Sequence, residues 1–204
     1  LILQEDVADE KIAMLSGAMD MLYLGDPGDP ATDVGPVIDR DAYDKLMSYR
    51  ETMRPRWIKT VEAPEEGLFV PPTMISIDEI EDLNKEWFGP LIHVATWKAG
   101  KLKETVQRVN AKGYGLTMGL HSRVQKSADV LQTWARVGNI YINRSQIGAV
   151  VGSQPFGGEG LSGTGPKAGG PHYLPRFCAE RAVSIDTTSA GGNASLLSLD
   201  TGEV

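Results

Sequence analysis

Residues 143–172 read NRSQIGAVVGSQPFGGEGLSGTGPKAGGPH, and the interpretation of the whole chain starts from this stretch. Nine of the 23 glycines fall between Gly148 and Gly170. Pro155 and Pro166 exclude a continuous helix, and the glycines weaken any strand. Five apolar side chains occur at a density that disordered linkers seldom reach: Ile147, Val150, Val151, Phe156 and Leu161. We therefore expect a fixed loop against a packed body, with a backbone that can approach a ligand closely.

Composition and charge are those of an ordinary globular protein. The 204 residues are enough for one domain with a sizeable core or for two small domains. A net charge of −7 and the absence of a lysine or arginine run argue against a nucleic-acid surface. No apolar run is long enough to cross a bilayer, and a single cysteine gives no support for secretion. We expect a cytoplasmic protein and, because the first residues carry no initiator Met, a piece of a longer one.

The spacing of apolar residues predicts strands that alternate with helices. A first helix begins at Val7, with Asp6 as its cap, and ends before the turn residues 25–30. The other expected helices span 39–53, 101–112 and 124–137. The expected strands span 1–5, 56–61, 68–77, 91–97, 116–121, 139–143 and 182–186. This alternation is typical of an α/β domain with a largely parallel twisted sheet and flanking helices.

Residues 158–163 match the letters of a G-x-G-x-x-G dinucleotide-binding motif, but their surroundings exclude that function. The motif must follow a strand and open a helix whose N-terminus holds a pyrophosphate. Here Pro155 precedes the glycines and a Thr-Gly-Pro sequence follows them, so no helix can begin.

Few side chains could supply nucleophilic or metal chemistry. Cys178 has no base and no helix start beside it, so we expect a buried structural cysteine. His93, His121 and His172 lie far apart and show no metal-ligand spacing, so we expect no metal site. His93 alternates within a strand, which indicates a structural role.

A second candidate is Glu86-Trp87-Phe88-Gly89-Pro90, which lies just before the strand expected at 91–97. A carboxylate at the end of a strand or turn can accept two hydrogen bonds from ribose hydroxyls, while an aromatic ring nearby shields a cofactor. The alternative is a solvated glutamate beside a core phenylalanine, and spacing alone favours this alternative.

Taken together, several motifs resemble those of the aldehyde dehydrogenase superfamily. The segment from Glu86 to Pro90 resembles its Glu-x-Phe-Gly-Pro motif, with Trp87 in place of a commoner small apolar residue. Asn110 and residues 113–117 resemble its Asn…Tyr-Gly-Leu segment. Residues 155–165 resemble its Pro-Phe-Gly-Gly…Ser-Gly-x-Gly element.

A narrower resemblance covers essentially the whole chain. Residues 147–152 and 162–173 are similar to those of glutamate-semialdehyde (pyrroline-5-carboxylate) dehydrogenases. Residues 187–197 resemble the ending of the bacterial bifunctional proline-utilisation flavoproteins, in which this dehydrogenase follows a proline dehydrogenase.

The resemblance implies a domain order. The nucleotide-binding domain and the catalytic cysteine would both precede this chain, so we expect no catalytic residue in it. Residues 1–178 would be the catalytic-domain portion, 179–188 an oligomerisation strand and 189–204 a flexible tail. The missing N-terminal domains of the same polypeptide would be partners. FAD would belong only to the absent proline dehydrogenase domain.

The resemblance also implies roles for individual residues. Glu86 would hold the nicotinamide ribose of NAD, and Phe88 would pack near the nicotinamide. Gly148 and Ala149 would anchor the α-carboxylate of the substrate, in agreement with the anion-binding concavity that consecutive backbone N–H groups form. Phe156 would pack on the aliphatic chain of the aldehyde.

In the family reaction a thiolate attacks the aldehyde, the hemithioacetal transfers a hydride to NAD, and water releases glutamate. We therefore expect part of a glutamate-semialdehyde dehydrogenase of proline catabolism, inactive by itself. The complete protein would be a homo-oligomer, peripheral at the inner membrane. Two alternatives stay open: a non-catalytic binding or assembly module with the same fold, and an aldehyde dehydrogenase for another substrate.

Overall fold

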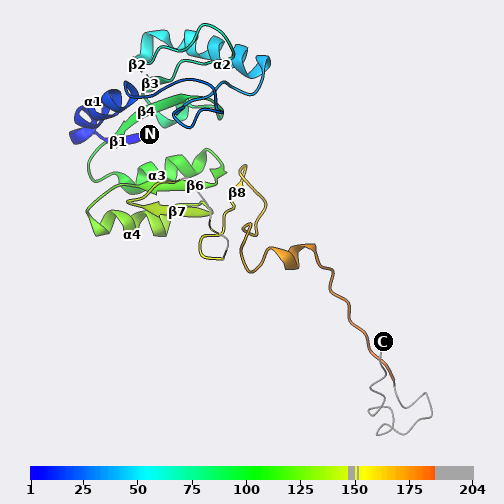
Figure 1. Ribbon diagram of the computed structural model, residues 1–204. Coiled ribbons are helices and arrows are strands. Elements are labelled where there is room, and N and C mark those ends of the chain that lie inside the picture. The colour runs from blue at the N-terminus through cyan, green and yellow to red at the C-terminus, as the bar shows by residue number, and fades with distance from the viewer. Residues whose placement is uncertain (147–149, 151, 187–204) are drawn as a thin grey trace.

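The structure, a computed structural model, describes residues 1–146, 150 and 152–186. It consists of two bodies and an arm (Figure 1). We call residues 1–97 the N-terminal body, the described residues of 101–170 the C-terminal body, and residues 171–186 the arm. The two bodies lie one against the other, and the arm extends away from both of them (Figure 1).

A four-stranded sheet organises the N-terminal body. Its strands lie in the order β1 (Ile2–Gln4), β4 (Leu91–Trp97), β3 (Thr73–Ser76) and β2 (Trp57–Thr60). Strands β1 and β3 run parallel to β4, whereas β2 is antiparallel to β3. Helices α1 (Ala8–Met19) and α2 (Arg40–Thr52) belong to the same body (Figure 1).

The C-terminal body is a strand–helix–strand unit with an added helix. Helix α3 (Leu102–Ala111) packs on α4 (Gln125–Trp134), and α4 connects the parallel strands β6 (Thr117–Leu120) and β7 (Asn139–Ile142). The same body also contains a short antiparallel pair, β5 (Tyr114–Gly115) with β8 (Glu159–Gly160). Parallel strand pairs with flanking helices confirm the expected α/β class.

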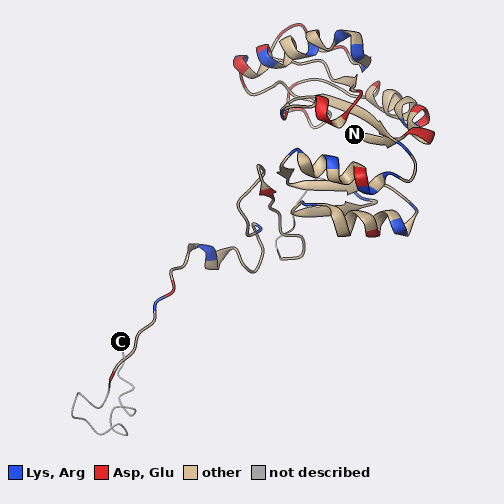
Figure 2. Ribbon diagram, turned by 180° about the vertical axis from the view of Figure 1, so that it is seen from behind, with Lys and Arg blue, Asp and Glu red and all other residues tan. Residues whose placement is uncertain are grey.

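Basic and acidic residues lie close together on the helices of both bodies (Figure 2). Among the described residues, no helix has both the length and the apolarity that a membrane crossing requires.

The core of the N-terminal body surrounds β3, whose side chains Thr73, Met74 and Ile75 are fully buried. Arg50 of α2 is also buried, at 8% exposure. Its Nε and Nη2 donate to the hydroxyls of Thr73 and Thr60, each at 2.7 Å, and its guanidinium lies 3.8 Å from the ring centroid of Trp57. Burial lowers the pKa of Arg50. The hydroxyl acceptors offset the cost of burying this cation.

Helix starts show where sequence signals succeed and where they fail. The Asp39 carboxylate accepts from the backbone N–H of Ala42 at 2.7 Å and so caps α2, which begins one residue after the start of the helix expected over 39–53. Asp6 does not cap α1, so that prediction is wrong. A 3-10 turn, η1 (Glu5–Val7), comes first, and α1 begins after Val7 without a side-chain cap.

Two expected strands differ from the structure by more than one residue at an end. The strand expected over 68–77 is reduced to β3, because Pro71 and Pro72 have no backbone N–H to donate to a neighbouring strand. The strand expected over 182–186 does not form in the single chain. A strand needs a partner, and the arm runs away from both bodies (Figure 1). Residues 187–204 lie outside the described residues.

The arm carries apolar side chains into solvent. After a 3-10 turn, η4 (Leu174–Phe177), Phe177 is 73% and Ile185 is 77% exposed. Cys178 is exposed as well, so the expectation of a buried cysteine is wrong. The sequence suggested burial because no activating neighbour was present, but Cys178 lies on a segment that packs against neither body.

Candidate functional site

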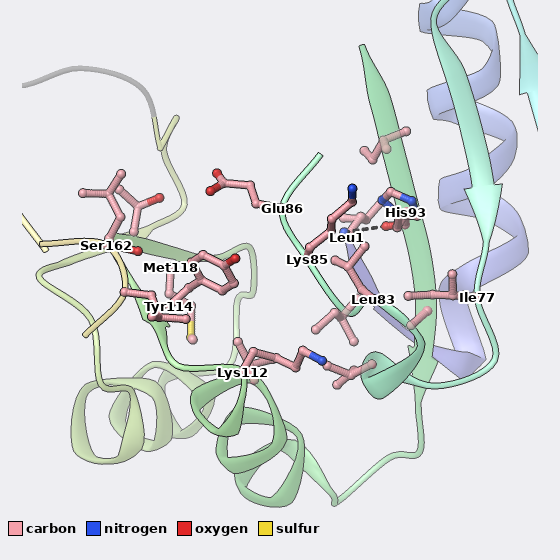
Figure 3. Close-up of a pocket in the computed structure, with 18 of the residues that line it drawn as sticks. Leu1, Ile77, Leu83, Lys85, Glu86, His93, Lys112, Tyr114, Met118 and Ser162 are labelled. Carbon is pink, nitrogen blue, oxygen red and sulfur yellow. Dashed lines mark hydrogen bonds between the residues drawn. The ribbon is translucent and has the colours of Figure 1, made fainter. Parts of the chain in front are cut away.

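A cleft of about 750 Å³ lies between the two bodies and is lined mainly by apolar side chains (Figure 3). The N-terminal body supplies Leu1, Ile2 of β1 and Ile92 of β4, while Leu116, Met118 and Leu161 line the cleft from the C-terminal body. Polar groups also line the cleft: Lys85, Glu86, His93, Lys112, Thr117 and Ser162. An apolar hollow with a few polar groups is typical of small-molecule sites.

The segment from Leu83 to Pro90, between the 3-10 turn η3 (Ile80–Asp82) and β4, brings Glu86 into the cleft. The Glu86 side chain points across the cleft toward Ser162 (Figure 3). Throughout the described part of the chain, no hydrogen bond or ion pair engages this carboxylate. It is therefore available to accept hydrogen bonds from a ligand.

Phe88 lines the same cleft, and its side chain is 81% exposed. It is not a core phenylalanine, so that part of the alternative reading is wrong. Trp87 between these two residues is half-buried and stacks on Tyr49 of α2. The segment thus carries a free carboxylate and an open aromatic ring on one side and a packed indole on the other.

His93 of β4 is half-buried beside the cleft. Its Nε2 lies 2.8 Å from the Tyr49 hydroxyl, and burial lowers the pKa of the imidazole. The interaction with Tyr49 agrees with the expected structural role. Among the described side chains, no three His, Cys, Asp or Glu residues come together to hold a metal ion.

An ion cluster fastens the segment that leads to Glu86. Arg108 of α3 binds the carboxylates of Glu79 and Glu81, and its Nε donates to Oε1 of Glu81 at 2.9 Å. The hydrogen bonds from Arg108 lower the pKa of Glu81 to about 2. This cluster connects η3 of the N-terminal body to a helix of the C-terminal body.

Two glycine-containing motifs far apart in the sequence meet in space. β5 pairs with β8, the N–H of Gly115 donates to Oγ of Ser162 at 3.1 Å, and the N–H of Leu161 donates to the carbonyl of Gly113 at 2.9 Å. At Gly158, a Cβ would stand 2.7 Å from the Gly115 carbonyl oxygen. Glycine here permits close contact between two backbone segments, whereas the sequence predicted only a close approach of the backbone to a ligand.

Phe156 is half-buried and held on both sides. Its N–H and carbonyl bond to the carbonyl and N–H of Ala168 at 3.1 and 2.8 Å. The side chain of Asn139 donates to the carbonyl of Pro155 at 3.0 Å and accepts from the N–H of Gly157 at 3.3 Å. Lys167 donates to the carbonyls of Gly157, at 2.8 Å, and Gly138. Gly148 and Ala149 lie outside the described residues.

The other motif residue, Asn110, has a structural role. Its side chain donates to the carbonyl of Trp134 at 2.7 Å and accepts from the N–H of Arg136 at 3.0 Å, so it ties α3 to the end of α4.

Sequence reasoning missed Asn139, Lys167 and Tyr49. One signal was available for Lys167, because it is the only cation between Gly148 and Gly170. The stack of Tyr49 on Trp87 depends on tertiary packing, and no local pattern indicates it.

Comparison with known proteins gives a consistent result. The aldehyde dehydrogenase family model matches residues 1–183. The chain is 47% identical over 191 residues to the bifunctional protein PutA of Klebsiella aerogenes, covering 89% of this chain and 15% of PutA. It is 37% identical over 188 residues to 1-pyrroline-5-carboxylate dehydrogenase of Geobacillus kaustophilus, covering 90% of this chain and 36% of that enzyme.

Solved structures agree. A proline utilization A (PutA) structure from Bradyrhizobium japonicum has a TM-score of 0.88 and 49% identity, covering 94% of this chain and 20% of that chain. A Thermus 1-pyrroline-5-carboxylate dehydrogenase with bound NAD has a TM-score of 0.78 and 32% identity, covering 87% of this chain and 35% of that chain. The chain therefore spans between about one seventh and about one third of the length of these relatives.

Proposed function

This chain belongs to the aldehyde dehydrogenase family, and we propose that it forms part of an NAD-dependent enzyme that oxidises glutamate semialdehyde to glutamate. The observation that carries the proposal is the cleft segment with Glu86 and Phe88. An unengaged carboxylate and an exposed aromatic ring two residues apart face the same hollow. The similarity to dehydrogenases named for pyrroline-5-carboxylate supports the choice of substrate.

The residues present fit a nicotinamide cofactor. Glu86 would accept hydrogen bonds from the ribose hydroxyls, since an ionised acceptor makes stronger hydrogen bonds than a neutral one. Phe88 would cover one side of the nicotinamide and exclude water from it. NAD, when bound, supplies the acceptor for the hydride that leaves the oxidised carbon.

The substrate contacts that we propose come from the glycine-rich stretch. Phe156 would pack on the aliphatic chain of the aldehyde, and its fixed backbone supports that role. Gly148 and Ala149 would hold the α-carboxylate through backbone N–H groups. The thiolate would come from polypeptide outside this chain, because Cys178 lies on the exposed arm.

The complete protein would be bifunctional, with an FAD-dependent proline dehydrogenase domain on the same polypeptide. The bifunctional relatives support this proposal. The exposed apolar side chains of Val183 and Ile185 support an oligomerisation strand over 179–188, and thus a homo-oligomer. A cytoplasmic location, with attachment to the inner membrane, belongs to the same proposal.

The test is the substitution Glu86→Ala in the complete protein. Losing hydrogen bonds to a charged acceptor costs about 1.5–3 kcal/mol, so the KM for NAD should rise by at least about tenfold. The KM for the aldehyde should stay nearly unchanged. An unaltered affinity for NAD would rule out the ribose role.

A further inference from the structure

Trp87 faces the opposite side of its segment from Glu86 and Phe88. Those two residues line the cleft between the bodies, whereas Trp87 lines a separate hollow with Tyr49 and Met53 of the N-terminal body. Glu86, Trp87 and Phe88 thus alternate between the two hollows, as successive side chains do where a backbone is extended. Fixing the indole therefore determines the direction of both neighbours.

The indole of Trp87 lies between two partners. The ring of Tyr49 stacks on it, with centroids 3.7 Å apart and planes inclined by 11°. The Lys85 ammonium lies 3.9 Å from the ring centroid of Trp87. Because Tyr49 already occupies one face at van der Waals distance, the ammonium lies over the other face. Both contacts are favourable, and together they leave the indole little freedom to turn.

Tyr49 is itself fixed at two points. It belongs to α2, and its hydroxyl lies 2.8 Å from Nε2 of His93 in β4. Burial raises the pKa of the Tyr49 phenol. The ring on which Trp87 stacks is thus connected to β4, the strand that follows the Glu86 segment.

A second contact, between Gly89 and Leu46, also holds the segment close to α2. At Gly89, a Cβ would stand 2.6 Å from Cδ1 of Leu46, which lies one turn before Tyr49 on the helix. A side chain at this position would collide with Leu46 unless Leu46 shifted, so glycine permits the close approach of the segment to Leu46. Trp87 on Tyr49 and Gly89 on Leu46 together set the path of the segment.

We propose that the Tyr49–Trp87 stack is a positioning pair, which aims Glu86 and Phe88 into the cleft. Neither ring lines the cleft, so both act through their neighbours. The inference rests on the proposed cofactor role of Glu86.

The test uses variants of the complete protein with separate measurements of KM for NAD, KM for the aldehyde and kcat. Trp87→Leu and Tyr49→Leu remove the stack, and each should raise the KM for NAD by about threefold to tenfold, the range that breaking an aromatic pair spans. The KM for the aldehyde should stay within about twofold. The double variant should be no worse than either single variant, because both remove the same contact.

Two further variants separate positioning from general packing. Trp87→Phe keeps a ring for stacking and should restore the KM for NAD to within about twofold of the wild type. Trp134→Leu is the matched control. Its indole also makes a cation–π contact, with Lys103 Nζ 3.7 Å from the ring centroid. Trp134, however, lies on α4 and lines neither hollow. It should leave all three constants unchanged.

The outcomes distinguish this inference from the function on which it rests. An unchanged KM for NAD in Glu86→Ala overturns the cofactor role itself. A raised value in Glu86→Ala with an unchanged value in Trp87→Leu overturns only the positioning pair. The positioning pair would also be overturned if Trp87→Leu raised both KM values and lowered kcat by similar factors, or if Trp87→Phe did not restore the KM for NAD. Either result would indicate that Trp87 supports the packing of the whole domain.

Discussion

Replacing Lys167 by Met tests how the backbone around Phe156 is held. The ammonium of Lys167 donates to the carbonyl of Gly157 at 2.8 Å, to Oδ1 of Asn139 at 3.4 Å and to the carbonyl of Gly138. Methionine keeps an unbranched aliphatic side chain but has no donor. The substitution thus removes these hydrogen bonds with little change in volume.

The effect of Lys167→Met on the free energy of local opening depends on how far the ammonium is buried. A hydrogen bond that involves a charged group contributes about 1.5–3 kcal/mol. Lys167 is only half-buried, so water can replace part of the loss. We expect local opening of the loop to become easier by about 1.4 kcal/mol, which is about tenfold in the opening equilibrium.

Amide hydrogen exchange reports this local opening directly. The N–H groups of Phe156 and Ala168 bond to each other's carbonyls, so both should exchange about tenfold faster in Lys167→Met. In the complete protein, the kcat/KM for glutamate semialdehyde should fall as well. Lys126→Met, an exposed lysine of α4, is the matched control and should leave both measurements unchanged.

Unchanged exchange at both amides would show that the Lys167 ammonium does not stabilise the backbone around Phe156. Faster exchange with an unchanged kcat/KM would keep the structural part and remove Phe156 from substrate binding.

The purified 204-residue chain should not oxidise glutamate semialdehyde with NAD, because its only cysteine, Cys178, lies on the exposed arm; measurable NADH formation would falsify this. Because Arg108 lowers the pKa of Glu81 to about 2, this pair stabilises the fold fully above about pH 4.5 and progressively less as pH falls toward 2. The difference in Tm between wild type and Arg108→Gln should therefore shrink from pH 5 to pH 3.5, and a constant difference would contradict the assignment. In the complete enzyme, Ala149→Leu should lower kcat/KM for glutamate semialdehyde by at least about tenfold and affect a simple aldehyde much less; equal losses would remove the anchor role.

Local patterns predicted most of the regular elements. The strand Leu91–Trp97 agrees at both ends, and α2 (Arg40–Thr52) lies within one residue of the helix expected over 39–53 at each end. Such features depend on residues near in sequence, which is why composition and spacing reveal them. Asp6 does not cap α1 because it lies within the 3-10 turn Glu5–Val7, and the strand expected over 68–77 is shorter because Pro71 and Pro72 precede β3.

Features that depend on distant residues could not be read from the sequence. The pairing of β5 with β8, the clamp formed by Asn139 and Lys167, and the stack of Tyr49 on Trp87 each join segments separated by at least 28 positions. Exposure was equally hidden, since Phe88 and Cys178 are residue types that usually lie inside proteins. The motif indicated the location of Glu86, but only tertiary structure places it on a cleft.

NADH formation by the complete protein tests most directly whether this chain is part of an enzyme that oxidises glutamate semialdehyde with NAD. The value of kcat/KM would be determined for glutamate semialdehyde and for pentanal, which has the same chain length and no carboxylate. We expect a preference for glutamate semialdehyde of at least about tenfold, because a site built for a carboxylate rejects a substrate that lacks one. Equal values for the two aldehydes, or no NADH formation with glutamate semialdehyde, would contradict it.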